Sequence, residues 1–258
     1  MKEILRASHI KKEYIDKPVL EDINLNLHQG EIVCLLGVSG VGKTTLFNIL
    51  SGLMIPDNGN VFLANDSVDE KTDDGDLLED ITGKPGHISY MLQKDLLLPH
   101  KTVIDNVSLP LVLNGMNKKE AREKAASFFE RFGLSGTEKK YPVQLSGGMK
   151  QRAALLRTYL CQKPVALLDE PFGALDTLTR EAIHEWYLKI MEEIKLSTIF
   201  ITHDIDEAIL ISDRILILKG SPASITDEII IGEPKPREGS FVLTDKFLEY
   251  KRLIKSKL

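Results

Sequence analysis

Residues 31–44 read EIVCLLGVSGVGKT, an apolar run that leads directly into a glycine-rich turn. The run from Glu31 to Leu36 shows no alternation after its first residue, which is typical of a strand buried on both faces of a parallel sheet. The residues from Thr44 to Leu50 are predicted to form a helix. This strand, turn and helix predict the core of an α/β domain.

The turn from Gly37 to Thr44 matches the phosphate-loop pattern G-x-x-x-x-G-K-[ST]. Its glycines let the backbone curl so that successive N–H groups face an anion, and the helix start adds partial positive charge. We therefore predict a nucleotide site in which Lys43 reaches the β- and γ-phosphates and the Thr44 hydroxyl ligates Mg²⁺. The predicted nucleotide-binding residues are Gly37, Ser39, Gly40, Gly42, Lys43, Thr44 and Thr45.

A second apolar strand, Val165–Leu168, ends in Asp169 and Glu170. An acid at the end of a buried strand is costly unless it has a function. Asp169 suits Mg²⁺, directly or through a ligating water, and Glu170 stands where a base could polarise an attacking water. The alternative is that both acids only cap the next turn. A phosphate loop alone does not choose among kinases, GTPases, helicases and transport ATPases.

The composition of the whole chain limits the classes of protein that it can belong to. Hydrophobic residues make up 43% of its 258 residues and charged residues 28%, which excludes a disordered chain and a small disulfide scaffold. No apolar run approaches the roughly 18–20 residues that span a bilayer, so a membrane role would need a partner. The first residues lack the apolar segment of a signal peptide. A net charge of −5 argues against general nucleic-acid binding.

Strands and helices alternate at both ends of the chain, with a helical block between them. Helices are predicted at Lys118–Phe132, Gly147–Leu160 and Leu178–Ile194, the last with Trp186 as a core residue. Cys34 and Cys161 are predicted to be reduced core residues. The acidic stretch at 69–80 is interpreted as a surface loop, with a cation site or a docking patch as alternatives.

Residues 145–152 read LSGGMKQR, which resembles the signature motif of ATP-binding cassette (ABC) ATPases. The resemblance covers residues 1–220. It implies a P-loop NTPase with a RecA-like parallel sheet core, an N-terminal antiparallel β-subdomain and a helical subdomain inserted at about 95–160. Residues 221–258 would be a tail that packs on the cassette. The activity implied is hydrolysis of ATP with Mg²⁺.

The resemblance also implies roles for single residues. Tyr14 would stack on adenine, although a plain strand tyrosine is the alternative. Gln93 would contact Mg²⁺ and the lytic water, Glu170 would be the general base, and His203 would touch the γ-phosphate. Three residues, Ser146, Gly147 and Gly148, would cap the γ-phosphate of a nucleotide held by the opposite subunit, and Asp176 would cross the dimer interface.

Two further strings narrow the kind of cassette. MLQKDLLLPHKTVIDNV (91–107) and LLDEPFGALDTLTR (167–180) are similar to the nitrate/sulfonate/taurine importer group, which includes thiamine-precursor importers, and Glu233–Arg237 resembles its tail. His100 stands where that group usually has Trp, and the acidic insert is longer, so the substrate stays open. The leucines at 96–98 would either receive a helix of a membrane subunit or pack the helical subdomain.

The resemblance to importers implies a set of partners. They are a second copy of the chain in a head-to-tail dimer, integral-membrane permease subunits and, indirectly, an extracytoplasmic solute-binding protein, with no nucleic acid. The chain would lie peripherally on the cytoplasmic face of the cell membrane. Two other hypotheses remain at this point: a soluble ABC ATPase of an assembly or repair complex, and an export ATPase with a separate membrane subunit.

Overall fold

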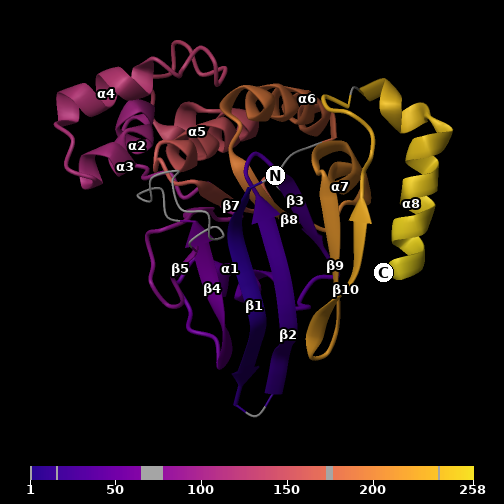
Figure 1. The fold of residues 1–258 in the computed structure, drawn as a ribbon. Helices are drawn as coiled ribbons and strands as arrows, with labels where there is room; N and C mark the ends of the chain where they lie inside the picture. Colours follow the sequence, from indigo (N-terminus) through magenta and orange to yellow (C-terminus); the bar gives the residue numbers. More distant parts are fainter. Residues whose placement is uncertain (1, 16, 65–77, 173–176, 238) are drawn as a thin grey trace.

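The computed structural model describes residues 2–15, 17–64, 78–172, 177–237 and 239–258 (Figure 1). Its centre is a ten-stranded sheet in the order β5-β4-β1-β2-β10-β9-β3-β8-β7-β6. The strands are β1 (Glu3–Tyr14), β2 (Lys17–His28), β3 (Ile32–Leu36), β4 (Asn58–Ala64), β5 (Leu78–Asp80), β6 (Ser89–Met91), β7 (Val165–Asp169), β8 (Ser197–Thr202), β9 (Arg214–Gly220) and β10 (Ala223–Ile230). The helices are α1 (Lys43–Leu50), α2 (Val103–Val107), α3 (Leu109–Leu113), α4 (Lys118–Ala126), α5 (Gly147–Tyr159), α6 (Thr177–Ile194), α7 (Ile205–Ile211) and α8 (Asp245–Lys257), with short 3-10 turns at Pro142–Gln144 and Gly239–Leu243.

The parallel half of the sheet carries the strand predicted from the opening motif. β3 pairs in parallel with β8 and β9, and β7 pairs in parallel with β8 and β6. All five residues of β3 are buried, as its unbroken apolar sequence predicted, because side chains of both faces enter hydrophobic clusters. The carboxyl ends of these strands therefore meet at one edge of the sheet.

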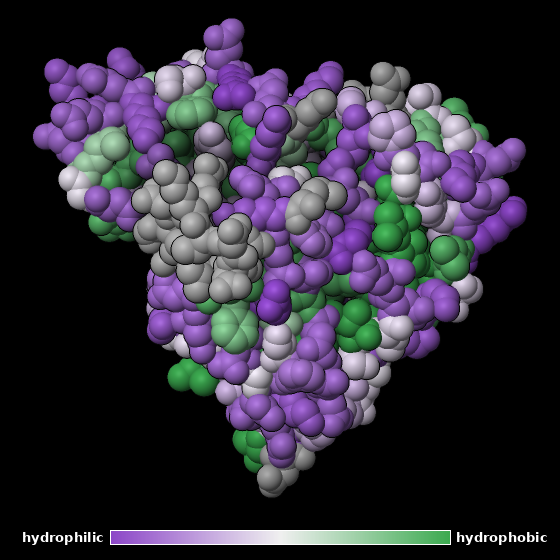
Figure 2. Space-filling model, viewed as in Figure 1, coloured by the Kyte–Doolittle hydropathy of each residue, from purple (hydrophilic) through white to green (hydrophobic). Residues whose placement is uncertain are grey.

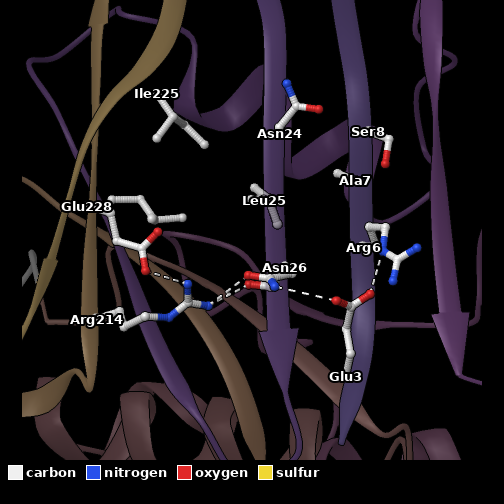
Figure 3. A pocket seen from close by; sticks show the side chains of 11 residues that line it. Glu3, Arg6, Ala7, Ser8, Asn24, Leu25, Asn26, Arg214, Ile225 and Glu228 are labelled. Carbon is white, nitrogen blue, oxygen red and sulfur yellow. Dashed lines mark hydrogen bonds and ion pairs between the residues drawn. The ribbon is translucent and has the colours of Figure 1, made fainter. Parts of the chain in front are cut away.

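The N-terminal antiparallel strands, β5, β4, β1 and β2, join the rest of the sheet over a short distance only, where β2 meets β10. β1 pairs with β2 and β4, and β10 pairs with β9, whereas β10 and β2 share the single register pair Ala223–Leu20. Beyond that pair the strands part and leave a pocket of about 320 Å³ (Figure 3). Arg214 bridges it, because its guanidinium donates to Glu228 at 2.8 Å and to the Asn26 side chain at 3.1 Å.

Helices α2 to α5 lie together at one end of the molecule (Figure 1). The prediction of a helix over Lys118–Phe132 is wrong in its later part, because α4 ends at Ala126. The following residues form turns, and the N–H groups of Phe128 and Phe129 donate to carbonyls three residues back. Phe129 and Phe132 are nevertheless buried, since a tight turn places residues three or four apart on one side much as a helix does. Trp186 is half-buried and packs edge-on against Phe132.

The segment after β9 contacts the rest of the chain closely. β10 extends the sheet beside β9, and α8 packs on α7. Phe247 and Ile254 of α8 are buried in the hydrophobic cluster that also holds Ile209 of α7. Figure 1 shows α8 on the side of the molecule opposite to α4. Lys257 pairs with Asp227 of β10 at 2.9 Å. These contacts anchor both ends of the segment.

The face in Figure 2 is largely polar, with apolar side chains in small groups. Of the two unpaired cysteines, Cys34 is buried as predicted, whereas Cys161 is only half-buried. Of the predicted acidic loop, residues 69–77 lie outside the described residues. Among the described helices, none has both the length and the apolar character needed to cross a membrane.

Candidate active site

The phosphate loop lies between β3 and α1, and two of its glycines are in close contact with neighbouring strands. A Cβ atom on Gly42 would lie 2.9 Å from the Leu20 side chain of β2. A Cβ atom on Gly37 would lie 2.5 Å from the carbonyl oxygen of Leu218. Gly42 caps α1 with φ 115°, a backbone conformation that favours glycine. Of the other predicted loop residues, Ser39 and Gly40 are exposed and Thr45 is half-buried in the first turn of α1. The loop backbone is thus fixed by packing against β9 and β2.

Lys43 is held inside this loop. Its Nζ donates to the carbonyl oxygens of Gly37 at 2.8 Å and Val38 at 2.9 Å, and the residue is only 6% exposed. Burial lowers the pKa of Lys43, while the charges of Glu170 and Asp169 oppose that shift. The ammonium group therefore lies where the loop curls, close to two carboxylates.

Asp169 ends β7 beside the phosphate loop. The Thr44 hydroxyl donates to its Oδ2 at 3.4 Å. Burial, reinforced by the charge of Glu170, raises the pKa of Asp169, whereas Thr44 and Lys43 lower it. Sequence reasoning missed Tyr90 of β6, whose pKa is raised by burial and by the charge of Asp169. The available signal was that Tyr90 begins the short apolar run Tyr90–Leu92 that leads directly into Gln93.

Three of the predicted catalytic residues meet at the adjoining strand ends. The Gln93 Nε2 donates to Glu170 Oε2 at 2.9 Å, and the His203 Nδ1 lies 3.2 Å from Glu170 Oε1. β7 and β8 pair with Asp169 opposite Ile201, and the Glu170 N–H donates to the Ile201 carbonyl at 3.1 Å. Residues that lie 77 and 33 positions from Glu170 in the sequence are thereby brought to one carboxylate.

Other predicted residues lie apart from this cluster. Tyr14 ends β1, is 42% exposed, and places its hydroxyl 3.1 Å from the Met54 sulfur. Ser146 caps α5 by accepting a hydrogen bond from the Met149 N–H at 3.3 Å. Ser146 and Gly147 are exposed, and Gly148 is buried. Within the described ranges, no hydrogen bond joins Tyr14 or Ser146 to the phosphate loop. Asp176 lies outside the described residues.

The leucines after Gln93 divide between two environments. Leu97 is buried in the core, whereas Leu96 is 53% exposed and Leu98 is half-buried. Arg157 of α5 holds the segment by donating to the carbonyl oxygens of Asp95 and Leu96. Leu97 therefore packs in the core, as one of the two interpretations expected, and the docking of a membrane-subunit helix on Leu96 stays a prediction.

Comparison with known proteins agrees with this geometry. Residues 20–173 match the family model described as ABC transporter. The chain belongs to this family. It is the ATP-binding subunit of an ABC importer, and it hydrolyses ATP. The P-loop NTPase fold predicted from the sequence is confirmed.

Two curated relatives and one solved structure illustrate the similarity. The formylaminopyrimidine import ATP-binding protein ThiZ of Halalkalibacterium halodurans is 43% identical over 86% of this chain and 82% of its own. The taurine import ATP-binding protein TauB of Escherichia coli K12 is 36% identical over 88% of this chain and 84% of its own. A dimeric cassette bound to ADP and phosphate superposes with a TM-score of 0.71 at 28% identity, covering 90% of this chain and all of the other.

Proposed function

We propose that two copies of this chain associate head to tail and bind ATP between the phosphate loop of one copy and residues 146–148 of the other. The N-terminus of α5 supports this, because Ser146 and Gly147 are exposed at the start of a 13-residue helix. Such a terminus favours an anion. Asp176 would cross the same interface. A dimeric cassette among the similar structures is a further support.

The residues around Asp169 suit Mg²⁺. A hydroxyl and a carboxylate, Thr44 and Asp169, lie side by side at the phosphate loop, and the Gln93 amide stands nearby on Glu170. Oxygen ligands of this kind, completed by phosphate oxygens and water, are what Mg²⁺ takes in nucleotide sites. Bound there, the ion would neutralise charge on the phosphates. Lys43 would contribute a second positive charge, since its Nζ already lies within the loop.

Glu170 would act as the general base. Its carboxylate is held from two sides, by Gln93 and by His203, which fixes the direction in which it can accept a proton from water. His203 is exposed, so its imidazole can turn towards a terminal phosphate while staying beside the base. Tyr14, at the exposed end of β1, would stack on the adenine ring.

The test of this site is Glu170→Gln. The amide keeps the shape of the side chain but cannot take up the proton, so hydrolysis should fall at least a hundredfold while ATP binding is retained. With ATP the variant should sediment as a dimer. Glu120→Gln, on the exposed face of α4, is the matched control and should keep the parent rate. A Glu170→Gln chain that remains a monomer at saturating ATP would contradict the proposal.

We also propose the setting and the class of cargo. The chain would act at the cytoplasmic face of the membrane with permease subunits and, through them, with an extracytoplasmic solute-binding protein. The cargo would be a small solute of the nitrate, sulfonate or thiamine-precursor pyrimidine kind. A pyrimidine is favoured because the formylaminopyrimidine relative is 43% identical, against 36% for the taurine relative.

Two measurements test this setting. Tagged Glu170→Gln chain would be captured with ATP from detergent-solubilised native membranes, and a multi-span permease should accompany it. A soluble partner alone would move the function to an assembly or repair complex. The captured transporter would then be reconstituted in vesicles with its solute-binding protein. Uptake of labelled formylaminopyrimidine should exceed uptake of taurine and nitrate; the reverse order would contradict the pyrimidine assignment.

A further inference from the structure

Behind the cluster of Glu170 and His203 lies a set of buried polar side chains that the proposed chemistry does not use. Glu207 of α7 is 4% exposed, Thr202 of β8 is 2% exposed, and His184 of α6 is 8% exposed. One oxygen of Glu207 accepts the Thr202 hydroxyl hydrogen bond at 2.6 Å, and the other lies 3.2 Å from His184 Nε2. Polar groups at this depth are costly unless they are paired, and here they are paired with each other.

The Thr202 hydroxyl also bonds to the backbone on the other side of His203. The Asp204 N–H donates to Thr202 Oγ1 at 3.0 Å, while the same hydroxyl donates to Glu207. The hydroxyl therefore acts as acceptor and donor together, which a serine could reproduce and a valine could not. The backbone of residues 202–204 is closed into a short hydrogen-bonded turn that carries His203 at its centre.

His203 depends on this turn for its position. Its side chain is 62% exposed. Its contact at 3.2 Å is with the Glu170 carboxylate, the group beside which it would act in hydrolysis. Little packing therefore restrains the imidazole, and its position follows from the main chain beneath it. Asp204 fixes the far side of the turn by capping α7, where its carboxylate accepts from the Asp206 N–H at 2.8 Å.

The buried set also reaches the segment after the base. The rings of His184 and Phe172 meet edge-on with centroids 4.7 Å apart, and Phe172 follows Glu170 by two residues. The contacts thus run from Phe172, two residues after Glu170, through His184 and Glu207 to Thr202, which immediately precedes His203. His203 in turn contacts Glu170. Base and histidine are supported by the same buried side chains.

We infer that Thr202 is a positioning residue for ATP hydrolysis: its hydroxyl, anchored on Glu207, sets the turn that aims His203 at the reacting phosphate. This inference rests on the role proposed above for His203. Displacement of a reacting group by about 1 Å can slow a reaction up to a hundredfold. Loss of one hydroxyl that holds a turn should therefore lower kcat about tenfold, without weakening the binding of ATP at the phosphate loop.

The experiment compares five variants of the full chain. Thr202→Val removes the hydroxyl, Thr202→Ser restores it, and His203→Ala removes the imidazole alone or together with Thr202→Val. Thr198→Val is the matched control, because Thr198 lies in the same strand, is fully buried, and donates its hydroxyl to the Leu196 carbonyl at 2.9 Å, away from His203. The measurements are kcat and KM for ATP and the Tm of each variant.

We expect Thr202→Val to lower kcat about tenfold with KM within twofold, and Thr202→Ser to keep kcat within twofold of the parent. Thr198→Val should lower Tm by a similar amount but leave kcat unchanged. In the His203→Ala background, Thr202→Val should add less than a twofold loss, because the residue acts through the missing imidazole. Should valine prevent folding, Thr202→Ala removes the same hydroxyl with less bulk and must show the same loss.

Three results would overturn the inference while leaving the proposed site intact: parent kcat in Thr202→Val beside a slow His203→Ala, an equal fall of kcat in Thr198→Val, or a full additional loss in the double variant. A His203→Ala chain with the parent kcat is a different result. It would remove the role proposed for His203, and the positioning role of Thr202 with it.

Discussion

Arg237 should be one of the side chains on which the stability of the cassette depends most. It follows β10, is only 4% exposed, and donates hydrogen bonds to backbone carbonyls from two segments. At the end of α7 its Nη1 reaches the carbonyl oxygens of Ile209 at 2.8 Å and Ser212 at 2.7 Å. Its Nη2 donates to the Glu233 carbonyl at 2.8 Å. Arg237 therefore caps α7 from the C-terminal segment.

The magnitude of its contribution can be worked out from these bonds. Each hydrogen bond from a charged donor is worth about 1.5–3 kcal/mol, and the last carbonyls of a helix have no partner of their own. Three short bonds would give about 6 kcal/mol. Desolvation of the guanidinium, which also lowers the pKa of Arg237, offsets part of this gain. Arg237→Met, which keeps much of the apolar stem, should therefore cost about 4 kcal/mol of unfolding free energy.

The assay is denaturant unfolding of both chains, together with a thermal melt. At roughly 2–4 °C per kcal/mol for a chain of this size, Tm should fall by about 8–16 °C. Arg252→Met is the control, since Arg252 is exposed on α8 and should change stability by less than about 0.5 kcal/mol. A loss below about 1.5 kcal/mol in Arg237→Met would refute the reasoning, because water would then satisfy the carbonyls as well as arginine does.

Three further predictions concern other parts of the cassette. The Arg122 guanidinium lowers the pKa of Asp105 to about 2, so the stability that this pair contributes is present above pH 4 and is lost as the pH falls from about 4 to about 2. Between pH 6 and pH 3 the unfolding free energy should therefore drop by about 1 kcal/mol through this pair. Arg122→Met should abolish that part of the pH dependence, but Arg252→Met should not. Gly37→Ala places a Cβ 2.5 Å from the Leu218 carbonyl oxygen and should weaken ATP binding more than tenfold. The control is Gly30→Ala, whose Cβ meets nothing within 4 Å at φ 75° and which should cost only about 1 kcal/mol of stability. Equal ATP affinity in the two variants would contradict this prediction. Tyr14→Ala should raise the KM for ATP about tenfold, because stacking on a base is worth about 1–3 kcal/mol. Tyr14→Phe, which keeps the ring, and Tyr141→Ala should leave this KM unchanged. An unchanged KM in Tyr14→Ala would show that Tyr14 is a plain strand residue.

The features that sequence predicts well are those carried by contiguous residues. The run up to Leu36 and the glycines after it predict a buried strand and a phosphate loop, because burial on both faces and close approach each leave a local signal. Asp169 ends a buried strand, Glu170 and His203 each follow one, and parallel strand ends meet at one edge. Their proximity was therefore within reach of sequence reasoning once the strands were assigned.

The features that sequence did not predict depend on partners far apart in the chain. Thr202 meets Glu207 locally, but His184 joins them from another helix, 23 positions before Glu207. Arg237 bonds carbonyls, which carry no side-chain signal at all. The wrong end of the helix predicted at Lys118–Phe132 has a related cause: periodic burial does not distinguish a helix from the turns that follow α4.

The position of Glu170 shows why the strand order matters more than any one motif. Its φ of 45° is uncommon for a residue with a side chain and costs about 1 kcal/mol or more. The bond from its N–H to the Ile201 carbonyl holds that conformation from β8. Gln93, which follows β6, and His203, which follows β8, then hold the two carboxylate oxygens. Because β7 lies between β6 and β8 with all three strands parallel, supports for the base arrive from both sides at one edge, and a sheet with β7 at its border could supply only half of them.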